Sequence, residues 1–228
     1  MFTGIVQGVA TVHAFTDRPG LRTLRLGFPE GFLAGVAIGA SIAVDGVCLT
    51  VTAFDEGQAW ADFDVMQQTL NLTTLGELRA GSRINVERAA REGAEVGGHV
   101  LSGHVDFCAE LAEIRRPDNN CVLRFSVPAP WMRYVFAKGY IAVNGASLTV
   151  AEAHCGADSA GWFEVWLIPE TLRMTTFGHK SVGQRAHIEI ERSTQVMVDT
   201  VRRTVDERLG PWMPLLQAWA RREGLDLP

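Results

Sequence analysis

Two stretches of this chain, 99 residues apart, repeat one another in sequence. Residues 42–51 read IAVDGVCLTV and residues 141–150 read IAVNGASLTV, so seven of the ten positions are identical. Three further pairs of blocks recur in the same order: FTGIV at 2–6 with LSGHV at 101–105, TLxxTTxG at 69–76 with 171–178, and GxRxxxE at 81–87 with 183–189. Four matching blocks in one order indicate a tandem duplication. A unit of about 100 residues is long enough to be a domain rather than a solenoid repeat.

Each copy carries the sequence signals of a β domain. Asp45-Gly46 and Asn144-Gly145 stand between apolar, β-branched runs, and such dipeptides favour the tight primed turn of a hairpin. Further strands are predicted at residues 4–12, 22–27, 60–66, 83–88, 105–114, 122–127, 163–168 and 185–190. Short helices are predicted at 29–34, at 130–136 and in the two TLxxTT segments, where a threonine can cap a helix. So many short strands predict an all-β chain of two small, closed or nearly closed barrels.

The pattern changes after Ser193. Residues 194–209 carry apolar residues at helical spacing, Gly210 is a stop signal, and residues 211–222 predict a second helix rich in tryptophan and leucine. We therefore divide the chain into a first barrel at 1–98, a second barrel at 99–193 and a helical tail at 194–228. The apolar stripe of the tail fits packing on its own domain or a contact between subunits.

The composition narrows the classes of function. The 21 Lys and Arg residues against 26 Asp and Glu residues give a net charge of −5, without the basic cluster that nucleic-acid binding requires. No apolar run reaches the ~18 residues of a membrane helix, and the first residues do not resemble a signal peptide. The four cysteines show no metal-binding or disulfide spacing. These features predict a cytoplasmic protein with free thiols and no membrane or nucleic-acid partner.

The whole chain resembles the riboflavin synthase family of the α-subunit type. The motifs that carry the resemblance are MFTGIV at 1–6, GGHVLSGHVD at 97–106, the paired GxxLTV blocks and LIPETL at 167–172. The resemblance implies two six-stranded Greek-key barrels, each with one bound lumazine, and a homotrimer held by the C-terminal helices. It also implies the dismutation of two 6,7-dimethyl-8-ribityllumazine molecules to riboflavin and a ribitylaminopyrimidinedione, with no metal or redox cofactor. An association with lumazine synthase would fit the same family.

The resemblance implies which residues bind the two ligands. For the first barrel they are Gly4, Ile5, Val6, Cys48, Leu49, Thr50, Asp64, Val65, Met66, Gln67, Gln68 and Thr69. For the second barrel they are Gly103, His104, Val105, Lys138, Ser147, Leu148, Thr149, Leu167, Ile168, Pro169, Glu170, Thr171 and Leu172. In the family, the first barrel of one subunit and the second barrel of its neighbour form the productive site.

The catalytic candidates lie where the two repeats differ. Cys48 aligns with Ser147, and Ile5 aligns with His104. We interpret Cys48 as a nucleophile or proton relay, although a free cysteine is equally often a small buried hydrophobe. His104 would assist proton transfer, or orient a hydroxyl that does; the alternative is a histidine that merely hydrogen-bonds a loop carbonyl, and the family resemblance favours the functional role. Ser147 is expected to donate a hydrogen bond or to position a water molecule.

Other polar residues near these blocks have weaker assignments. His99 follows two glycines at the join between the repeats, and we interpret it as structural. Lys138 would favour an anionic intermediate, or would simply be solvated. Thr50 and Thr149 are matched in both copies, which fits either a ligand contact or a strand-stabilising role.

Two other functions compete with that of a synthase. A lumazine- or flavin-binding antenna protein without catalysis would share this fold, but the candidate catalytic residues are all in place here. A flavin domain of a reductase would need a partner domain with a Gly-rich nucleotide-binding fingerprint, and the sequence contains none.

Overall fold

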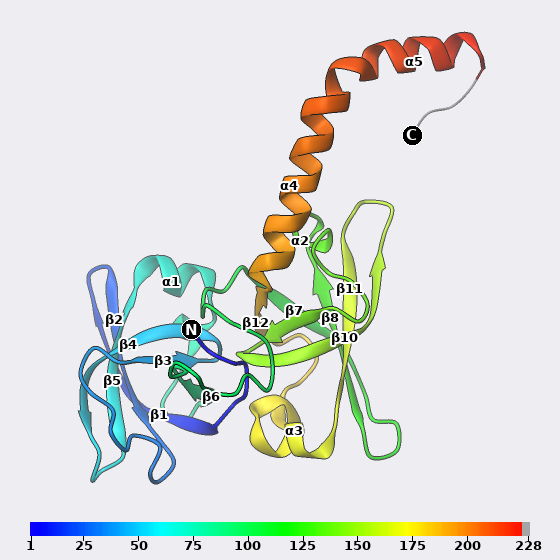
Figure 1. Ribbon diagram of the computed structural model, residues 1–228. Coiled ribbons are helices and arrows are strands. Elements are labelled where there is room, and N and C mark those ends of the chain that lie inside the picture. Colours follow the sequence, from blue (N-terminus) through cyan, green and yellow to red (C-terminus); the bar gives the residue numbers. More distant parts are fainter. Residues whose placement is uncertain (225–228) are drawn as a thin grey trace. The chain divides into compact units, whose positions relative to one another are not determined.

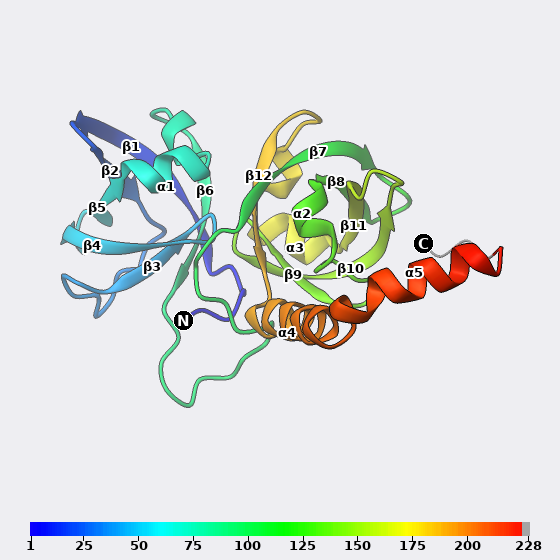
Figure 2. The same ribbon diagram turned by 90° about the horizontal axis from the view of Figure 1, so that it is seen from above.

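The computed structural model describes residues 1–224, which form two units, one of residues 1–191 and one that begins at residue 192. The first unit contains all twelve strands of the described residues, folded into two closed barrels that lie side by side (Figure 1 and Figure 2). The second unit is helical. The predicted all-β fold of two six-stranded barrels followed by a helical tail is therefore confirmed.

Both barrels have the same topology. The strands of the first are β1 (Gly8–Arg18), β2 (Leu21–Gly27), β3 (Ser41–Val44), β4 (Val47–Asp55), β5 (Trp60–Met66) and β6 (Arg83–Arg88). Those of the second are β7 (Phe107–Arg115), β8 (Cys121–Val127), β9 (Tyr140–Val143), β10 (Ala146–Cys155), β11 (Gly161–Leu167) and β12 (Arg185–Ile190). The order around the first barrel is β1-β2-β5-β4-β3-β6, and the second repeats it as β7-β8-β11-β10-β9-β12. The pairing of β2 with β5 joins non-consecutive strands, as in a Greek key.

Alternate side chains of the strands fill the interior of each barrel. On β5, Ala61, Phe63 and Val65 are fully buried, whereas Asp64 and Met66 face outward. Burying a large apolar side chain of this kind stabilises the fold by roughly 1.5–3 kcal/mol. Because packed side chains occupy the interior of such a narrow barrel, a ligand has to bind on its outer surface.

The hairpin turns form as the sequence predicts. Asp45 and Gly46 have φ angles of 45° and 84°, and Asn144 and Gly145 have φ angles of 43° and 77°. Both residues of a type I′ turn need a positive φ, which Asp, Asn and Gly adopt more readily than other residues.

The short helices follow the predictions less closely. The TLxxTT segments contain α1 (Gln67–Leu72) with the 3₁₀ turn η1 (Leu75–Glu77), and α3 (Pro169–Met174) with η2 (Thr176–His179). Thr175 caps η2 rather than the α-helix, because its side chain accepts a hydrogen bond from the N–H of Phe177. The helix α2 (Ala129–Met132) is shorter than expected. The prediction of a helix at 29–34 is wrong: Gly31 and Gly35 adopt φ angles of +76° and +67°, so the segment forms successive turns.

The segments ahead of β1 and β7 cross to the opposite barrel. Val6 belongs to the core of the second barrel, and Val105 packs against the core of the first. Phe2 and Leu101 pair where the two segments pass each other, with N–H to O distances of 2.9 and 3.0 Å between their backbones. This exchange explains why β1 begins at Gly8 rather than at Gly4 as predicted.

The two primed turns meet where the barrels touch. A Cβ atom on Gly46 would lie 2.7 Å from the backbone nitrogen of Gly145, and one on Gly145 would lie 2.8 Å from that of Gly46. No real Cβ contact is so short. Both positions therefore require glycine for the close approach as well as for the positive φ.

A symmetric set of hydrogen bonds surrounds this contact. The N–H of Asn85 donates to Oδ1 of Asp45 over 2.8 Å, and the N–H of His187 donates to Oδ1 of Asn144 over 2.7 Å. Between barrels, Nδ2 of Asn85 donates to the carbonyl of Asn144 over 3.0 Å, and Nδ1 of His187 lies 2.8 Å from the carbonyl of Asp45. His187 thus occupies in the second copy the place of Asn85 in the first.

The hydrogen bonds of His187 fix its protonation state. A carbonyl only accepts, so Nδ1 carries the proton that is donated to Asp45, while Nε2 accepts from the N–H of Thr74 over 2.9 Å. Burial lowers the pKa of His187 to about 4, an effect that the hydrogen bond to the Asp45 carbonyl opposes. Burial also raises the pKa of Asp45 to about 6, against the opposing effects of Lys180 and of the Asn85 N–H.

Replacing Asp45 by asparagine, which the second copy already has, is expected to stabilise the protein at pH 7. Because the pKa of about 6 in the folded state lies above the unfolded value of about 3.9, the charged form of Asp45 destabilises the fold above pH 6. The gain should be about 2–3 kcal/mol at pH 7 and should vanish between pH 6 and pH 4. Urea unfolding from pH 4 to pH 8 measures it. An equal gain at every pH would contradict the assignment of the penalty to ionisation.

The same substitution should expose the titration of His187. Its folded-state pKa is below the unfolded value, so stability is lost as the pH falls from 6.5 through 4. In the unaltered chain the opposite trend of Asp45 largely offsets this loss. The Asp45→Asn variant should therefore lose stability more steeply below pH 6.5.

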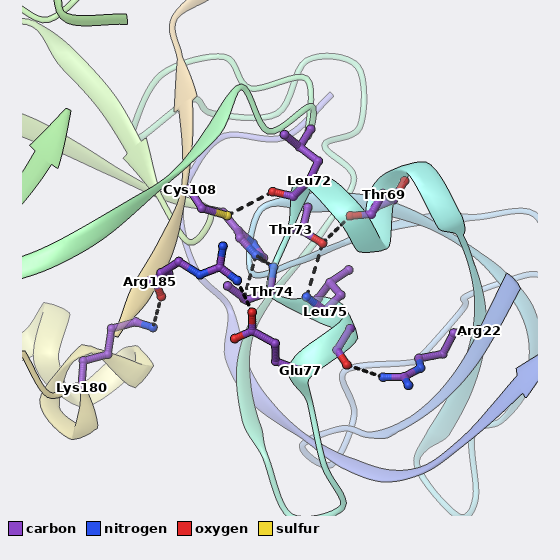
Figure 3. Close-up of polar contacts among 12 residues, drawn as sticks. Arg22, Thr69, Leu72, Thr73, Thr74, Leu75, Glu77, Cys108, Lys180 and Arg185 are labelled. Atoms are coloured by element: carbon purple, nitrogen blue, oxygen red, sulfur yellow. Dashed lines mark hydrogen bonds and ion pairs between the residues drawn. The ribbon is translucent and has the colours of Figure 1, made fainter. Parts of the chain in front are cut away.

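The segment that follows α1 connects the first barrel to β7 and β12 (Figure 3). The Leu72 carbonyl lies 3.2 Å from the Cys108 thiol, and Glu77 forms an ion pair with Arg185. Within the segment, the Thr73 hydroxyl donates to the Thr69 carbonyl over 2.7 Å. These contacts and the crossed segments place the two barrels in a single unit.

The tail contains the helix α4 (Arg192–Leu209), the 3₁₀ turn η3 (Gly210–Trp212) and the helix α5 (Met213–Arg222). The two helices predicted after Ser193 are confirmed, and the first of them ends one residue before Gly210. Large apolar side chains are exposed along the tail, namely Val196, Met197, Val201, Val205, Leu209, Trp212, Leu215, Leu216 and Trp219. Within residues 1–224, the structure has no helix that is long and apolar enough to span a bilayer.

Candidate functional site

The expected ligand residues form two equivalent clusters on the outer surfaces of the barrels. We call site 1 the cluster of residues 48–50 on β4, 64–66 on β5 and 67–69 on α1, together with residues 103–105. Site 2 is the cluster of residues 147–149 on β10 and 167–172 on β11 and α3, together with residues 4–6. In both sites the strand residues come from neighbouring strands of one barrel and the tripeptide comes from the crossed segment.

The two tripeptides lie on the barrel opposite to the one expected. The Gly103 carbonyl accepts a hydrogen bond from the Cys48 N–H over 2.8 Å, and the Gly4 carbonyl accepts one from the Ser147 N–H over 2.8 Å. The assignment of residues 4–6 to the first barrel and of 103–105 to the second is therefore corrected. The repeat alignment shows which blocks are alike, but it cannot show that they exchange places.

The outward face of each site is polar at its centre and apolar at its edge. Thr50 and Thr149 are exposed, and Cys48 and Ser147, two residues earlier on the same strand faces, are partly exposed. At the edges the side chains of Met66 and Ile168 are 63% and 57% exposed, at matched positions of the two copies. Exposed apolar side chains next to hydrogen-bonding groups suit a flat aromatic ring with polar substituents.

Some expected ligand residues face the barrel interior instead. These core residues are Val6, Leu49, Val65 and Leu167. Their side chains stabilise the barrels, so only their backbone groups are open to a ligand. Other expected residues are engaged with protein groups: Asp64 accepts from the Thr23 hydroxyl over 2.6 Å, and Glu170 forms an ion pair with Arg173 that lowers the pKa of Glu170.

The remaining expected residues lie at the rims of the sites. His104 and Lys138 are exposed, and the N–H of Lys138 donates to the Val150 carbonyl over 2.7 Å, next to Thr149. The surface helices α1 and α3 carry the last members of the two sets, which are Gln67, Gln68, Thr69, Pro169, Thr171 and Leu172. Leu148 packs partly against the core of the second barrel.

His99 is a functional candidate that the sequence interpretation missed. Its Nδ1 lies 2.6 Å from the hydroxyl of Ser147, and its ring stacks on Tyr140 with a centroid separation of 5.3 Å. Only 6% of His99 is exposed. Burial lowers the pKa of His99, and the negative charge of Glu191 opposes this shift. Its Nε2 is buried and has no hydrogen-bond partner among residues 1–224. A neutral histidine beside a hydroxyl can accept its proton.

The glycines ahead of His99 allow this contact. A Cβ atom on Gly98 would lie 2.3 Å from the Thr3 carbonyl and 2.6 Å from Cβ of Ser147. The pair Gly97-Gly98 is the one feature of the sequence next to His99 that could have indicated close packing, but it does not identify the partner, which is 48 residues further along the chain. Within residues 1–224, no histidine ring lies at hydrogen-bond distance from Cys48, the residue that matches Ser147 in the first copy.

Two pockets of the barrel unit do not include the central polar residues of these clusters, although Ile5 of site 2 lines the first of them. One of about 680 Å³ is lined by Ile5, Phe32, Glu87 and part of the segment that joins the barrels, and one of about 480 Å³ lies between η1 and η2. Cys48, Thr50, Ser147 and Thr149 line neither of them. Because Thr50, Thr149, Met66 and Ile168 are exposed, a second surface would have to cover sites 1 and 2 for a ligand to be enclosed.

The sequence profile of the lumazine binding domain matches residues 3–89 and again residues 102–191. The chain is 44% identical over 209 residues to the riboflavin synthase of Escherichia coli (strain K12), covering 91% of this chain and 95% of that protein. It is 44% identical over 192 residues to the riboflavin synthase of Mycobacterium tuberculosis (strain ATCC 25618 / H37Rv), covering 84% and 93%. With the riboflavin synthase of Chlamydia pneumoniae the identity is 41% over 203 residues, covering 89% and 96%.

Solved structures show the same fold. Crystal structures of LumP with 6,7-dimethyl-8-(1'-D-ribityl) lumazine and with riboflavin align with TM-scores of 0.72 and 0.73, covering 84% of this chain and 100% of theirs. At 23% and 24% identity these likenesses concern the fold alone. The matched domains and the identities over most of both chains place the protein among the enzymes of the riboflavin synthase family, in which the lumazine binding domain is duplicated.

Proposed function

We propose that the chain catalyses the dismutation of two 6,7-dimethyl-8-ribityllumazine molecules. A four-carbon unit passes from one molecule to the other and gives riboflavin and 5-amino-6-ribitylaminopyrimidinedione. The observation that carries the proposal is the pair of equivalent outward-facing sites, with Cys48 in one and Ser147 in the other. Two copies of one site suit a reaction that consumes two copies of one substrate.

Holding the two substrates face to face supplies most of the catalysis in this proposal. Positioning of reacting partners can lower a barrier by roughly 7–11 kcal/mol. The C7 methyl group of the lumazine is already acidic and its ring is electrophilic, so modest acid–base help suffices.

The two sites are not chemically equal, which favours separate donor and acceptor roles. In site 2 a neutral His99 is placed to take a proton from the Ser147 hydroxyl, so that Ser147 or a water molecule bound to it can act on the ring. In site 1 Cys48 has no histidine at hydrogen-bond distance within residues 1–224, and the exposed His104 lies on the tripeptide over that site. We assign the base-assisted step to site 2, with Cys48 and His104 serving the substrate in site 1.

The sites of a single chain lie on different barrels, and the outward face of each is exposed. We propose that site 1 of one subunit faces site 2 of a neighbour, which encloses both substrates, and that the apolar side chains of the tail hold a homotrimer together. A heterologous contact of this kind closes into a ring. Cytoplasmic location and an association with lumazine synthase stay predictions from the sequence.

The test is to mix the purified full-length protein with the lumazine and to follow riboflavin by its absorbance. We expect one riboflavin for every two lumazine molecules consumed, with no added metal or cofactor. Cys155→Ala, which changes an exposed thiol outside both sites, serves as a control that should keep this activity. Tight binding of lumazine without riboflavin formation would instead support the alternative function, a non-catalytic antenna protein.

A further inference from the structure

Two buried carboxylates stand at matched positions of the repeats. Glu87 at the end of β6 is 2% exposed, and Glu189 near the end of β12 is 6% exposed. Neither forms an ion pair within residues 1–191, and neither lies on an outward face of sites 1 and 2. A buried carboxylate outside an ion pair is costly, and at Glu87 the positive charge of the N-terminus is the last and smallest of the effects that oppose burial, so the hydrogen bonds of each carboxylate have to account for its place.

Each carboxylate binds three donors of one loop. Oε1 of Glu87 accepts from the N–H and the hydroxyl of Thr3 over 2.6 and 2.7 Å, and Oε2 accepts from the N–H of Gly4 over 3.0 Å. Oε1 of Glu189 accepts from the N–H and the hydroxyl of Ser102, both over 2.7 Å, and Oε2 accepts from the N–H of Gly103 over 3.0 Å. The two sets agree atom for atom.

The loops that these carboxylates hold reach the other barrel. Gly4, which Glu87 binds, accepts the Ser147 N–H of site 2, and Gly103, which Glu189 binds, accepts the Cys48 N–H of site 1. A Cβ atom on Gly4 would lie 2.5 Å from Cβ of Ser147, and one on Gly103 would lie 2.6 Å from Cβ of Cys48. A displacement of either loop therefore changes the position of a candidate catalytic side chain.

We propose that Glu87 and Glu189 are positioning residues with crossed targets. Glu87, on the first barrel, sets the geometry of site 2, and Glu189, on the second barrel, sets the geometry of site 1. The inference rests on the proposed function, since it takes both sites as lumazine sites. A carboxylate suits this role because it only accepts, whereas a glutamine would place an NH₂ group against one of the three donors.

The crossed roles can be tested by ligand protection of a thiol in each site. The parent protein is the full chain with Ser147→Cys, so that Cys48 reports on site 1 and the introduced thiol reports on site 2. The probe is 8-ribityllumazine, which keeps the ring and the ribityl chain but lacks both methyl groups and cannot react. Alkylation by iodoacetamide is read for each peptide by mass spectrometry, with the exposed Cys155 as the internal reference.

Glu189→Gln should raise the ligand concentration for half protection of Cys48 by about tenfold, the loss of roughly one charge-assisted hydrogen bond. It should leave protection of the introduced thiol unchanged. Glu87→Gln should give the reverse pattern. If either substitution fails to fold, Ser102→Ala and Thr3→Val remove one donor each and should give the same crossed pattern with smaller shifts.

The possible outcomes separate this inference from the proposed function. The crossed roles would be overturned if a substitution shifted the half-protecting ligand concentration equally at both thiols. They would also be overturned if it shifted this concentration only in the site on the barrel of the substituted residue. Either result would leave the proposed function standing. If the probe protects neither thiol in the parent protein, the proposed function itself is overturned. The crossed pattern with an unchanged urea midpoint would support the inference.

Discussion

Replacing Thr50 by arginine is expected to lower the rate of riboflavin formation at least about a hundredfold, and replacing Thr149 by arginine is expected to do the same. Each arginine would occupy the place where one of the two reacting substrates binds. Both side chains are exposed, so a larger residue fills the site without entering the core. The two variants form a matched pair, since they alter the same position of the two repeats. Initial rates with the lumazine measure the effect.

Mixing the two inactive variants tests whether a site is shared between subunits. If the proposed trimer assembles from both variants, some of its sites would combine an intact first barrel from one chain with an intact second barrel from another. Random assembly should restore about one quarter of the original activity per chain, because each half of a shared site comes from either variant at random. Reassembly after co-expression provides the mixed oligomer. No recovery in verified mixed oligomers would mean that both substrates bind to a single chain.

Replacing His99 by phenylalanine is expected to lower kcat by about a hundredfold, in the lower range of general acid–base catalysis. Phenylalanine keeps the stacking on Tyr140 but loses the hydrogen bond to Ser147. KM should change little, because the ring of His99 is buried behind Ser147 and is not part of the outward face. Steady-state kinetics separate the two parameters. A rise in KM at constant kcat would make His99 a binding residue.

The pH dependence distinguishes proton transfer from simple support of Ser147. Burial lowers the pKa of His99 below its ordinary 6.5, so the ring is neutral at pH 7 and activity should fall only below pH 6.5. The phenylalanine variant should lack this acidic limb. His99→Gln, which can still hydrogen-bond Ser147 but cannot take up a proton, should resemble the phenylalanine variant if His99 is a base. It should keep most of the activity if His99 only orients the hydroxyl.

Local signals were sufficient to predict the barrels. The Asp45-Gly46 and Asn144-Gly145 turns require positive φ, and the alternation of apolar residues on β5 matches its buried face. The repeat then gave the second barrel the same topology as the first. The helix predicted at 29–34 does not form because Gly31 within it and Gly35 just after it adopt positive φ and favour turns.

Long-range contacts could not be derived in the same way. An alignment of the repeats is unchanged whether residues 4–6 pack on their own barrel or on the other one, so the exchange had no sequence signal. Likewise the sequence placed His99 after two glycines at the join between the repeats, but the contact of His99 with Ser147 depends on the crossing of Phe2 and Leu101. Cys48, His104 and Ser147 were thus predicted as separate candidates, while the pairing of Ser147 with His99 came from the fold.

The crossed segments also bear on how such a chain could arise. A single ancestral barrel would have lacked a valine that packs against its core from outside. In this chain Val6 belongs to the core of the second barrel, and Val105 packs against the core of the first. Two ancestral copies that exchanged their first residues would each have received this valine from the other copy. Their matched turns would have met as Gly46 and Gly145 do here. Gene fusion would then have preserved an existing homodimer, and it would have allowed cysteine and serine to diverge at positions that symmetry had previously kept identical.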